Sequence, residues 1–294
     1  YFSRGCSDFP FEEGLVIGSG RLENILNGDV FDGDPSGSTW PGDTILGELG
    51  GDPNNTNNAT VIEFEFSSFE TDVSFDYIFA SYEYPGFVCS FADVFAFVIS
   101  GPFDDNGNYI GDDYPAGTTG VFNDEYLYNH NANPNDALLS LDLGGLNIAT
   151  VPDANGNPVP TTPTNIHNNE NCGAGTLGEF SLPQFFRGNS PSTALGGETT
   201  RLTASTQVIP CNKYKMKLMI ADWTDQIYNS FVFIEGGSFN IGADLGEDIT
   251  VETDFVLPYG EEQELTVFGG VLDTNCDIEI DWFLDGNLIE GAND

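Results

Sequence analysis

The pattern that most constrains the fold is a strict alternation of apolar and acidic side chains in Val61–Phe66. Ile62, Phe64 and Phe66 lie on one side of an extended chain, and the two glutamates between them lie on the other. Side chains of a β-strand point to alternate faces of the sheet. The alternation therefore predicts a strand with one buried face and one exposed face.

Further segments of this kind indicate an all-β protein. Val73–Tyr82 repeats the alternation, and Asp93–Ser100 is apolar on both faces, as in a central strand. No segment keeps a convincing helical period over three turns, while 35 Gly and 16 Pro separate the short apolar runs. We therefore predict a two-sheet β-sandwich of the jelly-roll or lectin-like kind. Its further strands are expected at Leu146–Val151, Arg201–Ile209, Lys213–Asp222 and Ser230–Phe239.

The charge balance excludes several partners. Lys and Arg total 7 against 47 Asp and Glu, so water, mobile ions or bound divalent cations must offset the repulsion. Nucleic acid and anionic lipid head groups are excluded as partners, because binding them relies on Lys and Arg clusters. The 24 Phe, 11 Tyr and 3 Trp indicate a folded chain rather than an acidic disordered one. No apolar run reaches 18 residues, so we expect no membrane insertion.

A change of pattern near Asn240 marks the expected boundary between two domains. Beyond it, Cys276 is followed six residues later by Trp282, in a segment that resembles the B-to-C strand region of immunoglobulin-like repeats of bacterial surface proteins. We therefore predict a β-sandwich over residues 1–240 and an incomplete immunoglobulin-like domain over 241–294. We expect further domains of the same protein beyond residue 294.

The cysteines indicate an extracellular protein. Five cysteines without a CxxC or His-rich pattern fit disulfides in an oxidising compartment better than a zinc site. Because the number is odd, one cysteine pairs outside the visible chain or stays free. Several pairings are compatible with the sequence alone.

Several blocks, taken in order, resemble one known family. The chain is similar to the choice-of-anchor L domain family, exported proteins mainly of Bacteroidota, over about residues 1–240. The resemblance implies a secreted or cell-surface module at the front of a long chain, often exported by type IX secretion. It also implies a Cys89–Cys172 disulfide, which leaves Cys6 with Cys211. The blocks are Asp8–Phe11, Gly14–Gly20, Phe75–Pro85, Phe91–Pro102, Asn147–Pro152, Tyr214–Asp222 and Phe231–Phe239.

Three acids are candidates for a ligand site because each lies at the end of an apolar strand: Glu83, Asp93 and Asp222. Carboxylates that converge repel one another unless a cation or a shared proton stabilises them, so the pattern favours a calcium or sugar-hydroxyl site. The alternative is that each acid caps a turn. Ala92–Phe97 is also similar to a stretch of legume-type lectins that binds sugar through its Asp, although Val94 replaces their preferred glycine.

Trp223 and Tyr228 stand beside Asp222 and Asp225, which is typical of a stacking platform with adjacent hydrogen-bonding acids in a sugar site. Packing under a loop is the alternative. These two aromatic residues and Asp225 complete the predicted ligand-binding set.

A calcium loop is predicted between Asp104 and Asp112. Asp104, Asn106, Asn108 and Asp112 offer side-chain oxygens at short intervals, which lets a tight loop surround a hard cation. The glycine of this loop is misplaced for an EF-hand.

The sequence favours binding over catalysis. Only His130 and His167 are present, neither in a metal or triad motif, so we expect no enzyme. The favoured function is an extracellular adhesion module that recognises glycan or another surface polymer, with calcium assisting. One alternative is a structural or tip subunit of an extracellular fibre that contacts neighbouring subunits. A glycan hydrolase, which needs only two carboxylates, is the second.

Overall fold

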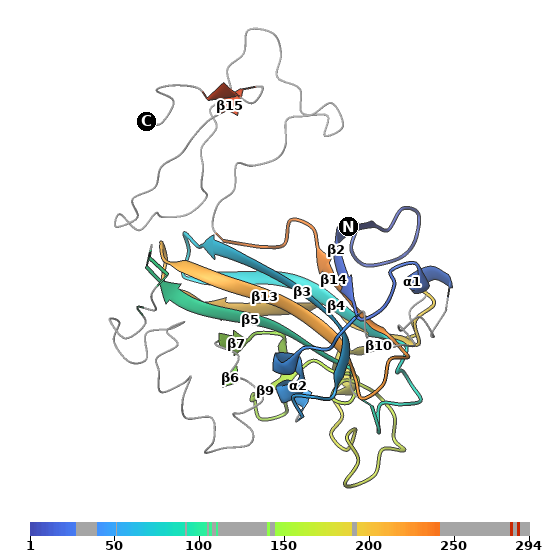
Figure 1. The fold of residues 1–294 in the computed structure, drawn as a ribbon. Coiled ribbons are helices and arrows are strands. Elements are labelled where there is room, and N and C mark those ends of the chain that lie inside the picture. Colours follow the sequence, from blue (N-terminus) through green and yellow to red (C-terminus); the bar gives the residue numbers. More distant parts are fainter. Residues whose placement is uncertain are drawn as a thin grey trace.

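The domain is built from two antiparallel sheets that face each other (Figure 1). The computed structural model describes residues 1–27, 40–50, 52–91, 93–104, 106–107, 110, 140–141, 145–189, 193–241, 283–284 and 287–288. The all-β class is confirmed, since helices in the described residues are short. They are α1 (Asn24–Asn27), α2 (Thr44–Gly50) and the 3-10 turn η3 (Pro183–Phe185).

The first sheet has the strand order β1-β2-β14-β4-β11-β10, and β12 also pairs with β4. Its centre is the β14–β4 pair, in which Val232 lies opposite Phe79. The strands are β1 (Phe2–Ser3), β2 (Glu13–Gly18), β4 (Asp72–Ser81), β10 (Phe186–Gly188), β11 (Gly197–Thr199), β12 (Leu202–Gln207) and β14 (Ser230–Glu235).

The second sheet has the order β3-β13-β5-β7-β6, and a small separate pair joins β8 to β9. The long strand β13 lies between β3 and β5 and is antiparallel to both. The strands are β3 (Thr56–Ser67), β5 (Val94–Phe103), β6 (Ser140–Leu141), β7 (Gly145–Asn147), β8 (Thr150–Pro152), β9 (Pro158–Pro160) and β13 (Lys213–Trp223).

The main core lies between the two sheets. Alternate residues of β4 meet alternate residues of β5 there: the rings of Phe75 and Phe97 are 4.8 Å apart, and those of Phe79 and Phe95 are 5.1 Å apart and stacked. The predicted apolar face of β3 also packs against this core, while Glu63 and Glu65 point to solvent. Aromatic pairs of this kind add to the burial of apolar area that stabilises the sandwich.

Two smaller apolar clusters cover the outer faces of the sheets. Helix α2 packs Leu46 and Leu49 against the outer side chains of β5 and β13, among them Val98 and Trp223. The second cluster packs Phe9 and Phe11, from the segment between β1 and β2, against outer side chains of the first sheet, among them Ile78. Since β5 has α2 on one side and the main core on the other, it is buried on both faces, as its sequence predicts.

The prediction of one continuous strand at Leu146–Val151 is wrong. The chain instead forms β7 and β8, which belong to different sheets. The cause is Asn147, whose Oδ1 accepts hydrogen bonds from the backbone N–H groups of both Phe97 and Ala149, at 3.1 and 3.0 Å. A side chain that bonds to nearby backbone in this way diverts the chain from the ladder. The expected strand at Ser230–Phe239 likewise ends at Glu235, before a turn in which Gly237 has φ +71°.

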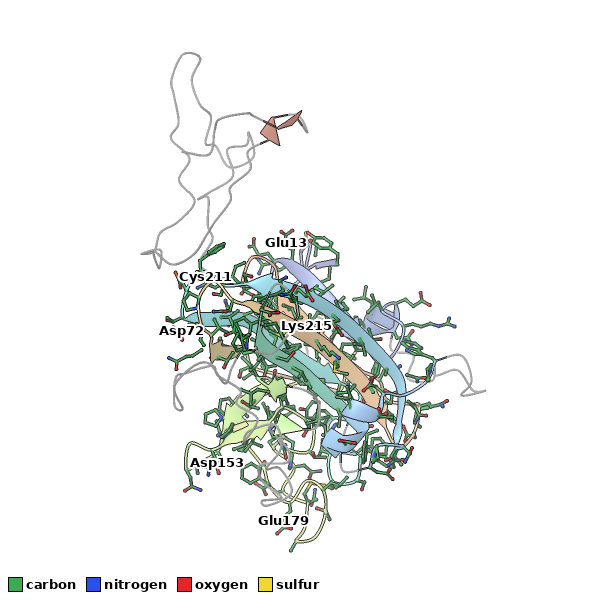
Figure 2. All side chains as sticks on the ribbon, turned by 60° about the vertical axis from the view of Figure 1, so that its left-hand side comes forward. Glu13, Asp72, Asp153, Glu179, Cys211 and Lys215 are labelled. Carbon is green, nitrogen blue, oxygen red and sulfur yellow. A yellow bond between two sulfur atoms is a disulfide. The ribbon has the colours of Figure 1, made fainter. Side chains whose placement is uncertain are left out.

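The Cys89–Cys172 disulfide is confirmed. The expected Cys6–Cys211 pair is not formed: Cys6 is a free, exposed thiol, and Cys211 is bonded elsewhere. Cys6 follows the edge strand β1 of the first sheet, whereas Cys211 precedes β13 of the second, so the two belong to different sheets. Figure 2 shows Cys211 near Asp72, at the end of the sandwich where β4 begins.

The predicted domain over 241–294, including Cys276, lies almost wholly outside the described residues. Within it the structure gives one antiparallel pair, β15 (Phe283–Leu284) with β16 (Asn287–Leu288). In the described part of the chain, none of the helices has the length and apolar character needed to cross a membrane.

Candidate functional site

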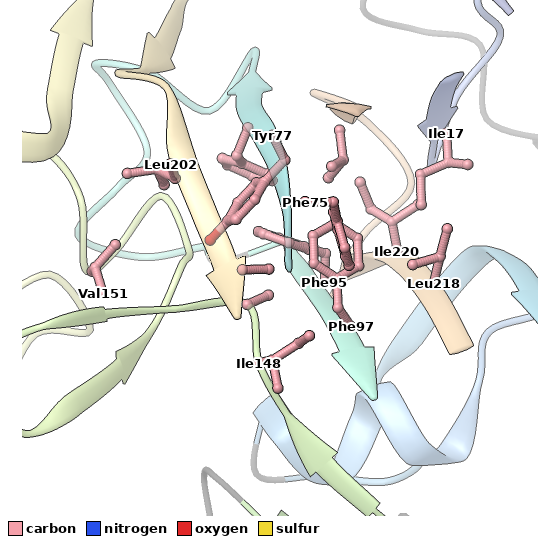
Figure 3. Close-up of a cluster of buried hydrophobic side chains, with 14 of the residues drawn as sticks. Ile17, Phe75, Tyr77, Phe95, Phe97, Ile148, Val151, Leu202, Leu218 and Ile220 are labelled. Atoms are coloured by element: carbon pink, nitrogen blue, oxygen red, sulfur yellow. The ribbon is translucent and has the colours of Figure 1, made fainter. Parts of the chain in front are cut away.

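The main core changes character at one end of the sandwich. The core-facing series Val73, Phe75, Tyr77 and Phe79 of β4 continues with Ser81, which is fully buried but polar. Figure 3 shows the apolar part of this core. Side chains two residues apart on a strand share a face, so each core-facing series can be followed to the end of its strand. In other strands of both sheets this series likewise passes from apolar to polar residues.

We call this end of the core the polar layer. Each member continues the core-facing positions of a strand or lies just beyond its end, and each is at most 1% exposed. The members are Ser19, Asn58, Ser81, Glu83, Asp93, Asp222 and Ser230, from β2, β3, β4, β5, β13 and β14. The sandwich thus buries three carboxyl groups where its antiparallel strands end and begin.

Hydrogen bonds tie the members of the polar layer together. Asp93 Oδ1 accepts from the backbone N–H of Trp223 at 3.1 Å, and its Oδ2 accepts from Ser230 Oγ at 2.6 Å. Asp222 Oδ2 accepts from Asn58 Nδ2 at 2.8 Å. The hydroxyls of Ser230 and Ser81 are 2.8 Å apart. The layer therefore connects both sheets through polar contacts.

No basic side chain neutralises these acids. All seven Lys and Arg residues of the sequence lie in the described part of the chain, and none forms an ion pair with the three buried acids or with Asp225. Arg201, for example, pairs with Asp76 and Glu235. Burying an ionised carboxylate without a partner is costly, so the layer favours uptake of a proton or of a cation.

The pKa values of the acids follow from this environment. Burial raises the pKa of Glu83 to about 9, and the charges of Asp93 and Asp225 add to the shift. Burial also raises the pKa of Asp93 to about 7, although hydrogen bonds from Ser230 and the Trp223 N–H lower it. For Asp222, burial and the charge of Asp93 raise the pKa against hydrogen bonds from Ser19 and Asn58. Shifts of this size are typical of functional sites.

Three oxygen atoms of the polar layer have no hydrogen-bond partner among the described residues: Asp222 Oδ1, Glu83 Oε2 and Asn58 Oδ1. Buried polar atoms in folded proteins are almost always paired. Carboxylate and amide oxygens are acceptors, so what they lack is a donor or a cation.

Two loops lie over the polar layer. The β4–β5 loop is held by the Cys89–Cys172 disulfide, and the β13–β14 loop carries Asp225 and Tyr228, both partly exposed. The ring of Tyr228 packs on Phe87 of the other loop, with centroids 4.4 Å apart. Tyr228 and Thr224 have φ values of +65° and +78°, a backbone strain that concentrates at functional sites.

The structure brings together four of the six predicted ligand residues. The charges of Asp93 and Asp225 act both on Glu83 and on Asp222, and that of Asp225 also acts on Asp93. Tyr228 lies on the loop above them. The stacking platform predicted at Trp223 is wrong, because this ring is only 8% exposed and packs under α2, where a Cβ added to Gly50 would lie 2.0 Å from it.

Sequence reasoning missed Asn58 and the three serines of the layer. A usable signal was present in each strand, since the apolar series of the core face ends in a polar residue just where the strand does.

The predicted calcium loop is only partly described. Asp104 Oδ1 accepts the backbone N–H of Asn106 at 2.9 Å, within a turn in which Gly107 has φ +79°. Asn108 and Asp112 lie outside the described residues. Across the described ranges, no three Asp, Glu, His or Cys side chains are arranged to hold a metal ion by themselves. Calcium at this loop stays a prediction.

Comparison with known proteins gives one match. The model of the choice-of-anchor L domain family matches residues 1–240, which span the whole sandwich. No curated protein and no solved structure matches the chain significantly.

Proposed function

Because the chain belongs to the choice-of-anchor L domain family, whose domains are surface-associated and extracellular, we propose that it is a binding module that attaches its parent protein to a surface polymer, with glycan as the favoured ligand. The observation that carries the proposal is the buried acidic layer beside two loops that are partly exposed. Building such a layer costs stability, and a cost of this kind is typical of a site retained for binding.

The loop side chains suit a neutral, hydroxyl-rich ligand. Asp225 offers a partly exposed carboxyl, and Tyr228 combines an aromatic ring with a polar tip. Hydroxyl groups donate hydrogen bonds to carboxylates, and sugar rings pack on aromatic faces. An anionic polymer would be repelled by a chain with net charge −40 unless cations bridged the two.

Calcium assistance belongs to the same proposal. A divalent cation beneath the loops, or in the loop that begins at Asp104, would offset part of the negative charge and fix the loop conformation. The ligand would then meet a preorganised surface, which lowers the entropy cost of binding.

The test is binding of the whole chain to an array of glycans and bacterial surface polymers, with calcium and with EDTA. We expect binding that Asp225→Asn weakens, because this change removes the charge and keeps the acceptor for the Ile227 N–H. Asp72→Asn is the matched control, since Asp72 is exposed at the other end of β4.

Each other outcome contradicts the proposal in a defined way. Absence of binding to every polymer tested would count against it. Association only with further copies of the chain would identify a fibre subunit. Shortening of an incubated polysaccharide would identify a hydrolase.

A further inference from the structure

Strand β3 is the longest edge strand of the two main sheets in the described part of the chain. It has 12 residues, whereas the other edge strands, β1, β6, β10 and β12, have two to six. One side of β3 pairs with β13 (Figure 1), and among the described strands none pairs with the other side. Such an open side presents backbone N–H and C=O groups that can pair with a further strand.

The segment before α2 closes only the beginning of this open side. It reaches β3 through the Pro41–Asn57 bridge, on the side away from β13. The Ala59 N–H donates to the Pro41 carbonyl at 2.9 Å, and the Ala59 carbonyl accepts from the ring N–H of Trp40 at 3.0 Å. Backbone groups of successive residues in a strand point alternately to its two sides. The residues whose N–H and C=O groups point to the open side after Ala59 are therefore Val61, Glu63 and Glu65.

The core-facing side chains of the same stretch are only partly buried. Ile62, Phe64 and Phe66 pack against the main core but keep part of their surface exposed. Tyr214 and Met216, which lie opposite Phe66 and Phe64 on β13, are fully buried. The difference arises because β13 has a neighbouring strand on each side and β3 has one on a single side. A strand added beside β3 would therefore bury further apolar area.

The charges on the outer face of β3 determine which strand fits. Proteins protect open edges with proline, bulges or charged side chains. The stretch Thr60–Ser67 has no proline, and its only charges are the two glutamates. Glu63 pairs with Lys217 of β13 at 3.3 Å, and Glu65 pairs with Lys215 at 3.6 Å. A strand with Lys or Arg at the positions facing these glutamates would continue the alternation of charge across the sheet.

The same glutamates disfavour a second copy of the chain as the partner. If two β3 strands paired antiparallel with their apolar faces on the same side, the central registers would place Glu63 opposite Glu63 or Glu65 of the other copy. Like charges directly opposite each other destabilise a strand pair. The net charge of −40 also repels another copy at longer range and attracts a basic partner.

We propose that the open side of β3, from Thr60 to Ser67, binds an extended segment of a different protein as an additional strand, with apolar residues facing the core and Lys or Arg opposite Glu63 and Glu65. Strand β3 already pairs with a segment of this kind, since Lys213–Leu218 of β13 alternates lysine with apolar residues. Backbone hydrogen bonds would supply affinity, and the alternate side chains would supply specificity. This surface goes beyond the proposed polymer site, which lies at Asp225 and its loop.

The experiment uses the whole chain and a fluorescent peptide with the sequence of residues 212–219, which carries the alternating lysines. Binding is measured by fluorescence anisotropy. A peptide of the same composition, with its three lysines adjacent, controls for simple attraction between a basic peptide and an acidic chain. We expect the alternating peptide to bind roughly tenfold more tightly, because only its lysines and apolar residues fall on opposite faces. Its binding should also slow hydrogen exchange at the amides of Val61, Glu63 and Glu65.

Two variants of β3 test the edge itself. Glu63→Lys combined with Glu65→Lys should weaken binding of the alternating peptide by roughly tenfold and favour a peptide with glutamate in place of the lysines. Glu63→Pro removes an N–H that points to the open side, a position at which an edge strand tolerates proline, and should block both peptides. Glu70→Lys combined with Asp72→Lys makes the same charge change at exposed positions outside β3 and should leave binding unaltered.

The outcomes that would overturn the proposal are distinct. They are no binding of the alternating peptide, equal binding of the two lysine peptides, and unchanged binding after charge reversal of Glu63 and Glu65. A wild-type dimer that Glu63→Pro dissociates would also overturn it, because a second copy would then occupy the edge. Thermal melts show which variants are folded, and the charge-reversal pair decides the question if the proline variant is not.

Discussion

Replacing Asp93 by Asn should stabilise the metal-free domain at neutral and alkaline pH. The substitution removes a buried charge and leaves an oxygen to accept from the Trp223 N–H, while the new amide group faces Ser230 Oγ, which can accept. Burial raises the pKa of Asp93 from 3.8 to about 7. Above pH 4 the unfolded chain therefore gives up this proton before the folded chain does.

The sign and size of the effect follow from proton linkage. Between the two pKa values the native state binds more protons than the unfolded state, so stability falls as pH rises. One pKa unit corresponds to about 1.4 kcal/mol, and the shift of roughly 3 units gives a penalty of order 4 kcal/mol that is complete above about pH 7. Glu83 and Asp222 act in the same direction, and burial carries the Glu83 contribution up to about pH 9.

The assay is urea unfolding in EDTA at several pH values from about 3.5 to 8.5. Asp93→Asn should match the wild type near the acid end and exceed it progressively toward pH 8, with a shallower slope of stability against pH. A variant that is less stable than the wild type at every pH, with an unchanged slope, would show that the structure stabilises the Asp93 carboxylate. The reasoning about the polar layer would then be wrong.

Two further predictions concern the framework of the site. Cys89→Ser removes the disulfide that closes a loop with a sequence separation of 83 residues. Chain entropy predicts that the free energy of unfolding, measured with a chemical denaturant, falls by roughly 4.5 kcal/mol. If reduction of the wild type left the denaturation midpoint unchanged, this prediction would be wrong. Gly50→Ala would place a Cβ 2.0 Å from the Trp223 ring and should destabilise by about 1–3 kcal/mol, whereas Gly86→Ala, which meets nothing within 4 Å, should be close to neutral in the same thermal melts.

The other two buried acids should behave as Asp93 does. Amide variants of Asp222 and Glu83 should gain stability in EDTA for the same reason as Asp93→Asn. If the layer served structure alone, these amide variants would instead be less stable than the wild type, because its polar contacts would then stabilise the fold by more than burying the charge costs.

Local patterns in the sequence determined the strands and their faces. The alternation in Val61–Phe66 predicted correctly that Ile62, Phe64 and Phe66 face the core and that the glutamates between them face solvent. Asp93–Ser100 was likewise predicted as a strand buried on both sides. Such predictions succeed because the period of two is a local property of extended backbone that burial on one face makes visible.

Only the tertiary structure decided which strand ends meet. Trp223 and Asp222 are neighbours in sequence, yet opposite faces of β13 send one under α2 and the other into the polar layer. The Cys6–Cys211 pairing failed for a related reason, since its two cysteines belong to different sheets. Asn58 lies beside Asp222, a residue 164 positions away in the sequence, only because their two strands meet in the fold. Sequence patterns report which face of its own strand a side chain occupies, so they do not predict contacts between residues so far apart.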